Sequence, residues 1–394
     1  MEKGSRDVRR YGDGYQRGDL FDGNNLFDAY AASLKGTSWK ASVQRYEIDY
    51  LLRLSSLQEE LRAHTYQIPN TTEFILNERG KTRVIHGQTF EARIALHVLC
   101  DNGLMPNLQP HFTFDNAASQ KGKGTDFARR RLVKHLQQFY NRTGSNNGWI
   151  LLGDFSKYYD NIQHPKAMEI LKKYISDSDA LWLSEQVMKH DEVDVSYLSD
   201  SEYAESMDML FNSLEYERSV PKSARTGEKM LKKHVNIGDQ FSQAIGLAYA
   251  MDIDSYITTV RGYGLSARYS DDFYVIGKTG EELEALLSDI TKIAAAKGIV
   301  INNRKTRICR LSDKWRFLKT QYSLLPSGKI RQRIDPDKIT RERKKLKRLP
   351  EKLSQPEYDD QFNGWYKANK KNMSHTQRRR IIKLYQERRM LCTH

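Results

Sequence analysis

The sequence predicts an α+β fold in which an antiparallel sheet is backed by helices. Three observations predict it: a hairpin pattern at residues 267–277, a buried strand leading into a turn at 148–162, and amphipathic helical patterns around them. The order strand, helix, hairpin, helix, strand is typical of an antiparallel sheet with helices against it. We find no internal repeat and no glycine-rich phosphate loop in the sequence.

Each predicted element has its own local pattern. Residues 1–35 are polar and glycine-rich, and we expect them to be poorly ordered in part. Helical apolar spacing predicts helices at 41–66, 90–104, 127–144 (basic and closed by Gly144), 242–257 and 281–298 (ending at Gly298). Strand patterns predict a strand pair at 73–87 joined at Glu78-Arg79-Gly80, the strand at 148–162, the hairpin, and a second strand pair at 299–311.

Size and charge narrow the function. The 394 residues are enough for two or three domain-sized units. A formal charge of +14 indicates a polyanionic partner, either nucleic acid or an anionic membrane surface. No apolar run approaches the roughly 18 residues of a membrane span, and the first residues lack the apolar core of a signal peptide. Three scattered cysteines argue against a disulfide framework or a zinc site. Nucleic acid is therefore the favoured partner, and a reduced cytoplasmic location is expected.

The charge is uneven along the chain. Residues 331–394 carry nineteen Lys and Arg against eight Asp and Glu, whereas 191–217 carry nine acidic residues and no Lys or Arg. The first segment is a candidate surface for a polyanion, or else a solvated helical face. The acidic segment would repel the same ligand, and we interpret it as an exposed insertion with no role in catalysis.

Three aspartates are the candidate catalytic centre. Asp271 and Asp272 are adjacent in the predicted hairpin, where turn chemistry is the alternative explanation for them. Asp154 ends the apolar strand Leu151-Leu152-Gly153. Three clustered carboxylates need compensation, which a hard divalent cation with oxygen ligands provides. Two Mg²⁺ ions in such a cluster can activate an attacking 3′-hydroxyl and stabilise the leaving oxygen, which is the chemistry of nucleotidyl transfer.

Several segments in a fixed order resemble the motifs of bacterial reverse transcriptases, over roughly residues 40–330. The resemblance lies in "ERGKTRVIH" for the fingers, "DFSKYYDNI" for motif A, "IGDQFSQAIGLAYAMDIDSYI" for motif B, "YSDDF" for the YxDD box of motif C, "NNRKT" for motif D and "WRFLKTQY" for motif E. It implies a right-hand polymerase fold. The expected divisions are 1–40 as an N-terminal extension, 41–150 as fingers, 151–330 as palm with an acidic insertion at about 190–235, and 331–394 as a basic helical thumb.

The resemblance also implies roles at the catalytic centre. Asp154 and Asp271, with Phe155 beside them, would bind two Mg²⁺ ions, for which Mn²⁺ can substitute. Asp272 would contribute more weakly to the metal site, or be an ordinary turn residue. Lys305 would neutralise or protonate the departing pyrophosphate, unless it is an ordinary surface lysine.

The nucleotide site implied by the resemblance draws on three segments. Its residues are Lys81, Arg83, Phe155, Tyr159, Ile237, Gly238 and Gln243. Lys81 and Arg83 would clamp the triphosphate, or be exposed side chains of an ordinary strand. Tyr159 would exclude ribonucleotides by a clash with the 2′-hydroxyl, or pack in the core. Most reverse transcriptases have Gln-Gly where this chain has Ile237-Gly238, which puts ordinary copying fidelity in doubt. The Ile-Gly-x-x-x-Ser-Gln form resembles diversity-generating retroelement enzymes and defence-associated bacterial groups.

Three further groups are candidates for contact with nucleic acid. They are Lys121, Lys123, Arg129 and Arg130 around a Lys-Gly-Lys-Gly segment, Phe317 and Leu318 at the primer grip, and Arg378, Arg379 and Arg380 in the thumb. A solvated loop, core packing and a solvated helix face are the respective alternatives.

The expected function is that of an RNA-directed DNA polymerase adding dNTPs to a primer 3′ end. No nuclease or integrase segment follows the polymerase core, so we expect a bacterial or phage-encoded enzyme that copies a dedicated non-coding RNA in antiviral defence. The alternatives are a diversity-generating retroelement enzyme, untemplated or protein-primed DNA synthesis, and an RNA-binding protein with an inactive polymerase fold. The expected partners are template RNA, DNA product and dNTPs, with no membrane. The acidic insertion is a candidate contact for a homo-oligomer or another partner.

Overall fold

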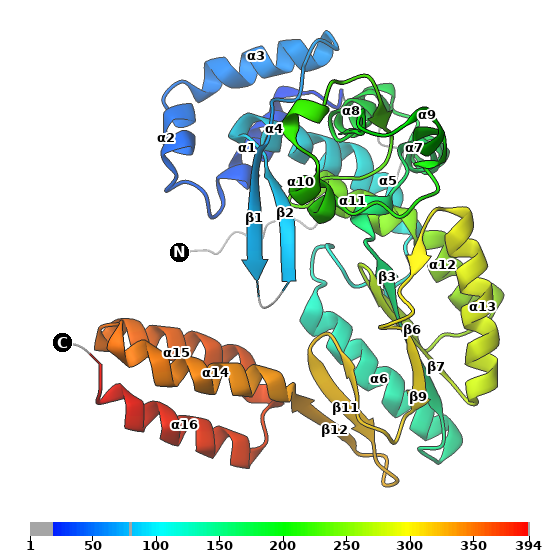
Figure 1. Ribbon diagram of the computed structural model, residues 1–394, viewed down its shortest axis with the longest axis vertical. Helices are drawn as coiled ribbons and strands as arrows, with labels where there is room; N and C mark the ends of the chain where they lie inside the picture. Colours follow the sequence, from blue (N-terminus) through cyan, green and yellow to red (C-terminus); the bar gives the residue numbers. More distant parts are fainter. Residues whose placement is uncertain (1–18, 79–80, 393–394) are drawn as a thin grey trace, which may run out of the picture. The chain divides into compact units, whose positions relative to one another are not determined.

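The computed structural model describes residues 19–78 and 81–392 (Figure 1). The chain forms two compact units, and each is assembled from separate segments of the sequence. The first unit consists of Met1–Pro110, His164–Met207 and Asn212–Ile245, and the second of His111–Gln163, Asp208–Phe211 and Gly246–His394. The segments predicted as fingers and as palm each contribute to both units, and the division into fingers, palm and thumb stays a prediction.

The first unit is mainly helical. Its helices are α1 (Gly23–Leu34), α2 (Ala41–Glu47), α3 (Tyr50–Arg62), α4 (Phe90–Val98), α5 (Met105–Leu108), α7 (His164–Tyr174), α8 (Ser178–His190), α9 (Asp200–Glu205) and α10 (Ser213–Ser219). Its strands are β1 (Thr72–Glu78), β2 (Lys81–Gly87), β4 (Val193–Asp194) and β5 (Met230–Leu231). The β1–β2 hairpin confirms the strand pair predicted at 73–87, and the acidic insertion is ordered around the antiparallel β4–β5 pair.

One prediction for this unit needs correction, and a second is tested only in part. The helix predicted over 41–66 is broken between α2 and α3, where Asp49 has φ of −131° and is not helical. Of the segment 1–35, predicted to be poorly ordered in part, residues 23–34 form α1, which is capped by the Asp22 carboxylate accepting a hydrogen bond from Asn24 N–H. Residues 1–18 of this segment lie outside the described residues.

The second unit is built on an antiparallel sheet. Its strands are β3 (Trp149–Ser156), β6 (Ser266–Tyr269), β7 (Asp272–Gly277), β8 (Val300–Ile301) and β9 (Arg307–Arg310), in the order β6-β7-β3, with β8 and β9 both pairing to the other edge of β3. The central strand β3 is buried from Ile150 to Phe155, which explains its continuous apolar pattern. The predicted hairpin and strand are confirmed. Both strands predicted at 299–311 are present, but they pair with β3 and not with each other, because β3 offers its free edge to each in turn.

Helices accompany this sheet where helical patterns predicted them, except that the single helix predicted at 242–257 is split at Ala250, whose φ of −103° and ψ of 10° are not helical. They are α6 (Thr125–Thr143), α12 (Met251–Ser255) and α13 (Gly280–Ala296), while α11 (Gln240–Tyr249) crosses from the first unit to the second. Helix α6 ends at Gly144, whose positive φ of 65° suits glycine at a helix C-terminus. Helix α13 begins with a capping box between Thr279 and Glu282.

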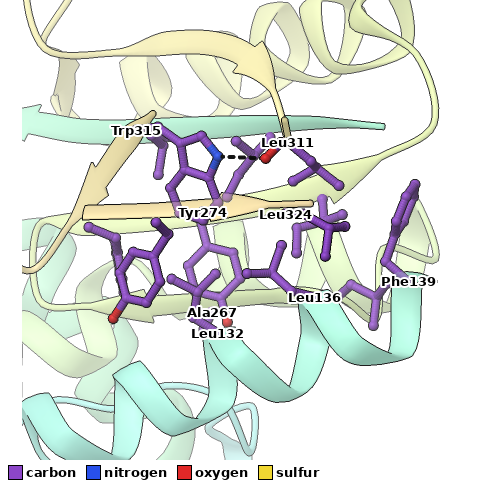
Figure 2. Packing of buried hydrophobic residues seen from close by; sticks show 14 of the residues in the cluster. Leu132, Leu136, Phe139, Ala267, Tyr274, Leu311, Trp315 and Leu324 are labelled. Carbon is purple, nitrogen blue, oxygen red and sulfur yellow. Dashed lines mark hydrogen bonds between the residues drawn. The ribbon is translucent and has the colours of Figure 1, made fainter. Parts of the chain in front are cut away.

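The core of the second unit lies between α6 and the strands (Figure 2). Leu132, Leu136 and Phe139 of α6 contact a cluster that includes Tyr274 of β7 and Trp315. A second antiparallel sheet of β10 (Trp315–Phe317), β11 (Thr320–Leu324) and β12 (Ile330–Ile334) contributes to the same cluster. This shared core fixes the strands that carry the catalytic candidates.

The C-terminal region forms a three-helix bundle, visible as α14 (Pro336–Arg348), α15 (Gln355–Asn369) and α16 (His375–Arg389) in Figure 1. Its own small core includes Leu346, Tyr358, Phe362 and Ile381. The cations of this region are mostly outside that core, as in an amphipathic bundle. No helix in the described part of the chain is long and apolar enough to cross a membrane.

Candidate active site

The β6–β7 hairpin presents Asp271 and Asp272 at a two-residue turn. Tyr269 pairs with Asp272, so Ser270 and Asp271 form the turn itself. Ser270 has φ of +58°, a left-handed conformation that most hairpins give to glycine or asparagine. The main chain of Asp271 is held against the neighbouring strand because its carbonyl accepts a 3.1 Å hydrogen bond from Phe155 N–H.

Strand β3 brings Asp154 beside the same hairpin. Asp154 and Asp272 are register partners on the adjacent strands β3 and β7. The preceding Gly153 allows this close packing, since a Cβ there would lie 2.1 Å from the Phe273 ring. The backbone therefore brings the three predicted aspartates together at neighbouring strand ends, as the sequence led us to expect. Phe155 itself is buried, with its ring 5.4 Å from that of Phe273.

A lysine neutralises the Asp154 carboxylate. Lys305 Nζ donates to both oxygens of Asp154, at 2.8 and 2.7 Å, and Asn302 Nδ2 donates to one of them at 2.9 Å. The segment carrying both residues folds over Asp154, because Asn302 N–H donates to the Asp154 carbonyl at 2.8 Å. The Lys305 side chain is 53% exposed, whereas that of Asp154 is 7% exposed. The ammonium is therefore free to move into solvent, while the carboxylate is fixed.

The carboxylates suit a hard divalent cation, subject to one rearrangement. Within residues 19–78 and 81–392, no three His, Cys, Asp or Glu side chains are already arranged to hold a metal ion. At this site, Asp154 is instead paired with Lys305. The donor chemistry still fits Mg²⁺ or Mn²⁺, because Asp154, Asp271 and Asp272 supply only carboxylate oxygens. An ion bound to Asp154 would have to displace Lys305.

A buried arginine positions the catalytic turn. Arg268, three residues before Asp271, is 2% exposed and forms an ion pair with Asp254. Its Nη1 donates to the Ser270 carbonyl at 3.0 Å, and its guanidinium also reaches the carbonyls of Gly246 and Leu247. Burial alone would lower the pKa of Arg268, but the Asp254 carboxylate raises it above its usual value. Arg268 therefore stays charged and ties the turn to α11 and α12.

Tyr159 lies against the same turn. Its hydroxyl is 3.0 Å from Ser270 Oγ, and a Cβ on Gly246 would lie 2.8 Å from its ring. Burial raises the pKa of the Tyr159 phenol, so the hydroxyl stays protonated. Tyr159 is half-buried, whereas its neighbour Tyr158 is buried and donates to the Gly246 carbonyl at 2.8 Å. Of the two tyrosines, Tyr159 has the ring that can meet a ligand.

In the first unit, strand β2 lies against the predicted motif B. His86 N–H donates to the Ile237 carbonyl at 3.5 Å, and a Cβ on Gly238 would lie 3.3 Å from the His86 carbonyl oxygen. Gly238 also has φ of +137°, which favours glycine. The strand that carries Arg83 is thus brought to Ile237 and Gly238, as predicted for a nucleotide site. The side chain of Lys81 lies outside the described part of the structure.

Two buried carboxyls hold the motif B segment in place. Asp191 accepts hydrogen bonds from the main-chain and side-chain nitrogens of Asn236, and Asp239 accepts one from Ser242 N–H at 2.7 Å. Burial raises the pKa of both carboxyls. These contacts flank Gly238 on both sides. By contrast, Gln243, another predicted nucleotide contact, is exposed on α11.

The Lys-Gly-Lys-Gly segment is only partly available to a ligand. Lys123 Nζ donates to the carbonyls of Phe114 and Asn116, at 2.9 and 3.1 Å, and lies over two aromatic rings. Burial lowers the pKa of this ammonium. The prediction of Lys123 as a phosphate contact is therefore replaced by a role in holding the loop, while Lys121 and Arg130 are exposed.

Phe317 and Arg129, two predicted contacts for nucleic acid, are also engaged within the protein. Phe317 is 4% exposed, with its ring 5.0 Å from that of Tyr274, so its side chain fills the core instead of meeting a primer. The next two residues, Leu318 and Lys319, both have positive φ, at 44° and 62°. Arg129 holds this tight turn, because its Nη2 donates to the Leu318 carbonyl at 2.7 Å. Arg129 therefore supports the turn, which itself lies at the end of the β10–β11 hairpin.

The three predicted thumb arginines do not lie together on one face of α16. Arg378 and Arg379 line a pocket between α15 and α16, and Arg380 does not. Each residue of an α-helix is rotated by about 100° from the one before it, so three consecutive residues cannot share a narrow face. The sequence run "RRR" gives no indication of which of the three arginines line the pocket.

Sequence reasoning missed Arg268, Asp254 and Asn302. A signal for the ion pair was present, since Arg268 stands in an otherwise buried strand pattern and Asp254 in a mostly apolar helix pattern. Two opposite charges in buried patterns point to a pair, because neither can be buried alone. Asn302 is the first residue of the motif D segment "NNRKT", but its contact with Asp154 depends on the fold of that segment.

Comparisons with known proteins identify the family of the chain. The family model described as reverse transcriptase (RNA-dependent DNA polymerase) matches residues 68–322. No curated protein matches the chain. Among solved structures, telomerase from Candida albicans in complex with a TWJ fragment of telomeric RNA is similar at 13% identity and a TM-score of 0.43, over 73% of this chain and 52% of that one. Apo telomerase from Candida tropicalis is similar at 14% identity and a TM-score of 0.40, over 67% and 48%. The chain thus spans about half the length of these two solved chains.

The family match includes every strand that carries a catalytic candidate. It extends from before the β1–β2 hairpin to β11 and so includes Asp154, Asp271, Asp272 and Lys305. It also covers well over half of the chain. The chain belongs to the reverse transcriptase family, with a right-hand polymerase fold.

Proposed function

We propose that the chain extends a primer 3′ end with dNTPs at Asp154, Asp271 and Asp272, copying a dedicated non-coding RNA in antiviral defence. One observation carries the site assignment: Asp154 and Asp272 are paired across β3 and β7, with Asp271 held to β3 by the Phe155 N–H bond. Mg²⁺ is the proposed ion, because carboxylates together with substrate phosphates are its preferred ligands.

The residues of the chain would divide the work as follows. Asp154, Asp271 and Asp272 hold two divalent ions, which supply activation of the 3′-hydroxyl and stabilisation of the leaving oxygen. Lys305, once released from Asp154, is placed to meet the charge that develops on the pyrophosphate. Tyr159 excludes ribonucleotides. Lys81 and Arg83 bind the triphosphate, and a guanidinium can do so with two parallel hydrogen bonds.

Removing Lys305 should strengthen the binding of divalent ions. The Lys305 ammonium competes with an ion for both Asp154 oxygens, and an ion pair whose ammonium is about half exposed to solvent is worth about 1 kcal/mol. We therefore expect Lys305→Ala to bind Mn²⁺ up to about fivefold more tightly, by titration of free Mn²⁺ with electron paramagnetic resonance. Arg304→Ala removes a neighbouring exposed charge and is the matched control. Equal affinities in the two variants would contradict the competition.

Shortening Tyr159 should relax the choice of sugar. In Tyr159→Ala the ring that would clash with a 2′-hydroxyl is gone, so kcat/KM for a ribonucleotide should rise relative to the deoxyribonucleotide by roughly tenfold. Tyr159→Phe keeps the ring and loses only the contact with Ser270, so its ratio should stay near that of the unmodified enzyme.

The neighbouring tyrosine provides the control for this experiment. Tyr158 is buried and hydrogen-bonded to Gly246, so Tyr158→Ala should lower the melting temperature without changing the sugar ratio. An unchanged ratio in Tyr159→Ala together with a lower melting temperature would assign Tyr159 to the core and move the sugar gate elsewhere.

The biological role has a separate test. Its support is the Ile237-Gly238 and Ser242-Gln243 pattern, which resembles defence-associated and diversity-generating enzymes. Purifying the protein from its host and sequencing the bound nucleic acid should recover one abundant structured RNA and complementary DNA. Cells carrying the gene should also resist phage, and Asp271→Asn should remove that resistance. Recovered DNA that matches a variable coding region favours a retroelement, and DNA without a template counterpart favours untemplated synthesis.

A further inference from the structure

The pocket between α15 and α16 combines apolar and cationic walls. Its volume is about 560 Å³, and its lining includes Tyr366 of α15 with His375, Arg378, Arg379, Ile382 and Lys383 of α16. The α16 residues recur every three or four positions, so they lie on one face of the helix. Among the described residues that line the pocket, none is acidic.

The contacts at the opposite end of the helix pair explain why the cations of the pocket remain available to a ligand. There, Asp359 of α15 accepts hydrogen bonds from Arg389 Nε at 2.7 Å and from the Tyr385 hydroxyl at 2.5 Å. The Tyr385 ring also stacks on Phe362, with centroids 4.0 Å apart, which packs the two helices firmly. The acidic partner and the aromatic packing thus hold one end of the pair closed.

The pocket end of the pair is also fixed in place. Ser374 caps α16, with Gln377 closing the capping box. Arg378 Nε donates to the Met373 carbonyl at 3.2 Å, which fixes the direction of its guanidinium. Lys383 has one acidic neighbour, Glu387, at 3.9 Å, and this pair is exposed. The pocket therefore exists before any ligand arrives and carries net positive charge.

We propose that this pocket binds an unpaired stretch of polynucleotide, with a base against Tyr366 and Ile382 and phosphates at Arg378, Arg379 and Lys383. A duplex keeps its bases stacked inside, so along its length it presents its phosphate backbone and no base face that could stack on an aromatic wall. A single strand presents base faces that stack on aromatic rings while cations follow its backbone. The exposed cations of α14, Arg341, Lys344, Lys347 and Arg348, do not line this pocket and suit a duplex backbone better.

The proposal rests on the enzyme's handling of nucleic acid, but its test needs no catalysis. Fluorescence anisotropy would compare three labelled probes, a single-stranded RNA and a single-stranded DNA of about 15 nucleotides and a blunt duplex. We expect Tyr366→Ala to bind at least one single strand at least about fivefold more weakly, and the duplex as before. Tyr366→Phe should bind like the unmodified protein. A loss of affinity for the single-stranded RNA would indicate that the pocket binds template, and a loss of affinity for the single-stranded DNA would indicate that it binds product.

Two arginines on the same helix provide a matched pair. Arg379→Gln should lower the log–log salt slope of single-strand binding by about 0.7, the value expected for one phosphate contact. Arg380→Gln removes the same charge one residue further on, outside the pocket, and should leave the slope unchanged. Both side chains are exposed, so neither change threatens the fold.

Two results would overturn the proposal. One is unchanged single-strand affinity in Tyr366→Ala, and the other is an equal loss for single strands and duplex in Arg379→Gln and Arg380→Gln alike. Primer extension at saturating template should continue in all these variants, because Asp154, Asp271 and Asp272 are untouched. Loss of binding with retained extension thus separates this pocket from the polymerase site.

Discussion

Asp271→Asn is expected to abolish dNTP incorporation while leaving RNA binding intact. Asp271 lies in a two-residue turn whose main chain is fixed by Phe155 N–H and whose neighbour Ser270 is fixed by Arg268. The variant therefore keeps its backbone position and loses only one negative charge. Removing a group that merely orients a metal ligand typically costs 10–100-fold in affinity or activity. Loss of a direct ligand should cost more than about a hundredfold.

The measurement is single-nucleotide addition on an RNA template with Mg²⁺, alongside RNA binding and a melting curve. Asp208→Asn is the matched control, because it removes one exposed carboxylate far along the chain from the catalytic strands. It should retain full activity. If Asp271→Asn also retained it, the assignment of the catalytic centre would be wrong. A lower melting temperature in Asp271→Asn would point to a structural role for the carboxylate.

The catalytic strands could be predicted because their signals are local. The apolar run ending at Asp154 and the aromatic stretch around Asp271 and Asp272 each define a strand within a few residues. Antiparallel pairing of these strands then brings the aspartates together, as the β3–β7 register shows. The tight turn was also predictable, since Ser and Asp are usual turn residues.

The partners of individual side chains were not predictable in the same way. Lys123 and Lys121 stand two residues apart in the same glycine-rich segment, yet only Lys123 is occupied by carbonyls. Phe317 was compatible with primer contact or core packing, and its place beside Tyr274 depends on how the β10–β11 hairpin packs on β7. The Lys123 contacts depend on how the loop folds back on Phe114 and Asn116, and the Phe317 contact joins residues distant in sequence, so no helix or strand pattern encodes either.

The division into units was equally hidden from local patterns. The chain leaves the second unit after Gln163 and passes through α7 to α10. Apart from the short segment Asp208–Phe211, it returns to the second unit only at Gly246. Each of these elements has ordinary helical or strand signals, and none indicates which core it joins. Asp154 and Lys305, 151 residues apart, meet only because β3 pairs with β8 just before Asn302.

The second large effect is expected at Arg268. Breaking a buried ion pair by removing one partner typically costs about 3–5 kcal/mol, because an unpaired charge is left inside. Arg268→Met leaves the Asp254 carboxylate buried without its cationic partner, so we expect the melting temperature to fall by roughly 6 °C or more. Activity should fall too, but this variant alone does not separate instability from a misplaced turn.

A double variant separates the two effects. In Arg268→Met with Asp254→Leu, both charges are gone, and replacing a buried ion pair by apolar residues is often close to neutral. The melting temperature should therefore recover most of its loss. Activity should not recover, because the Ser270 carbonyl still lacks its donor and the turn that carries Asp271 is no longer tied to Gly246 and Leu247. We expect kcat to stay at least about tenfold low, as for other groups that orient catalytic ligands.

Arg268→Lys sharpens this comparison. A lysine can keep the charge pair with Asp254, but it lacks the planar fork that lets Arg268 reach Asp254, Ser270 and Leu247 together. Its melting temperature should be nearer that of the unmodified enzyme than that of Arg268→Met, with kcat still reduced. Recovery of both melting temperature and kcat in the double variant would show that Arg268 only stabilises the core. Recovery of the first without the second assigns Arg268 to holding the catalytic turn.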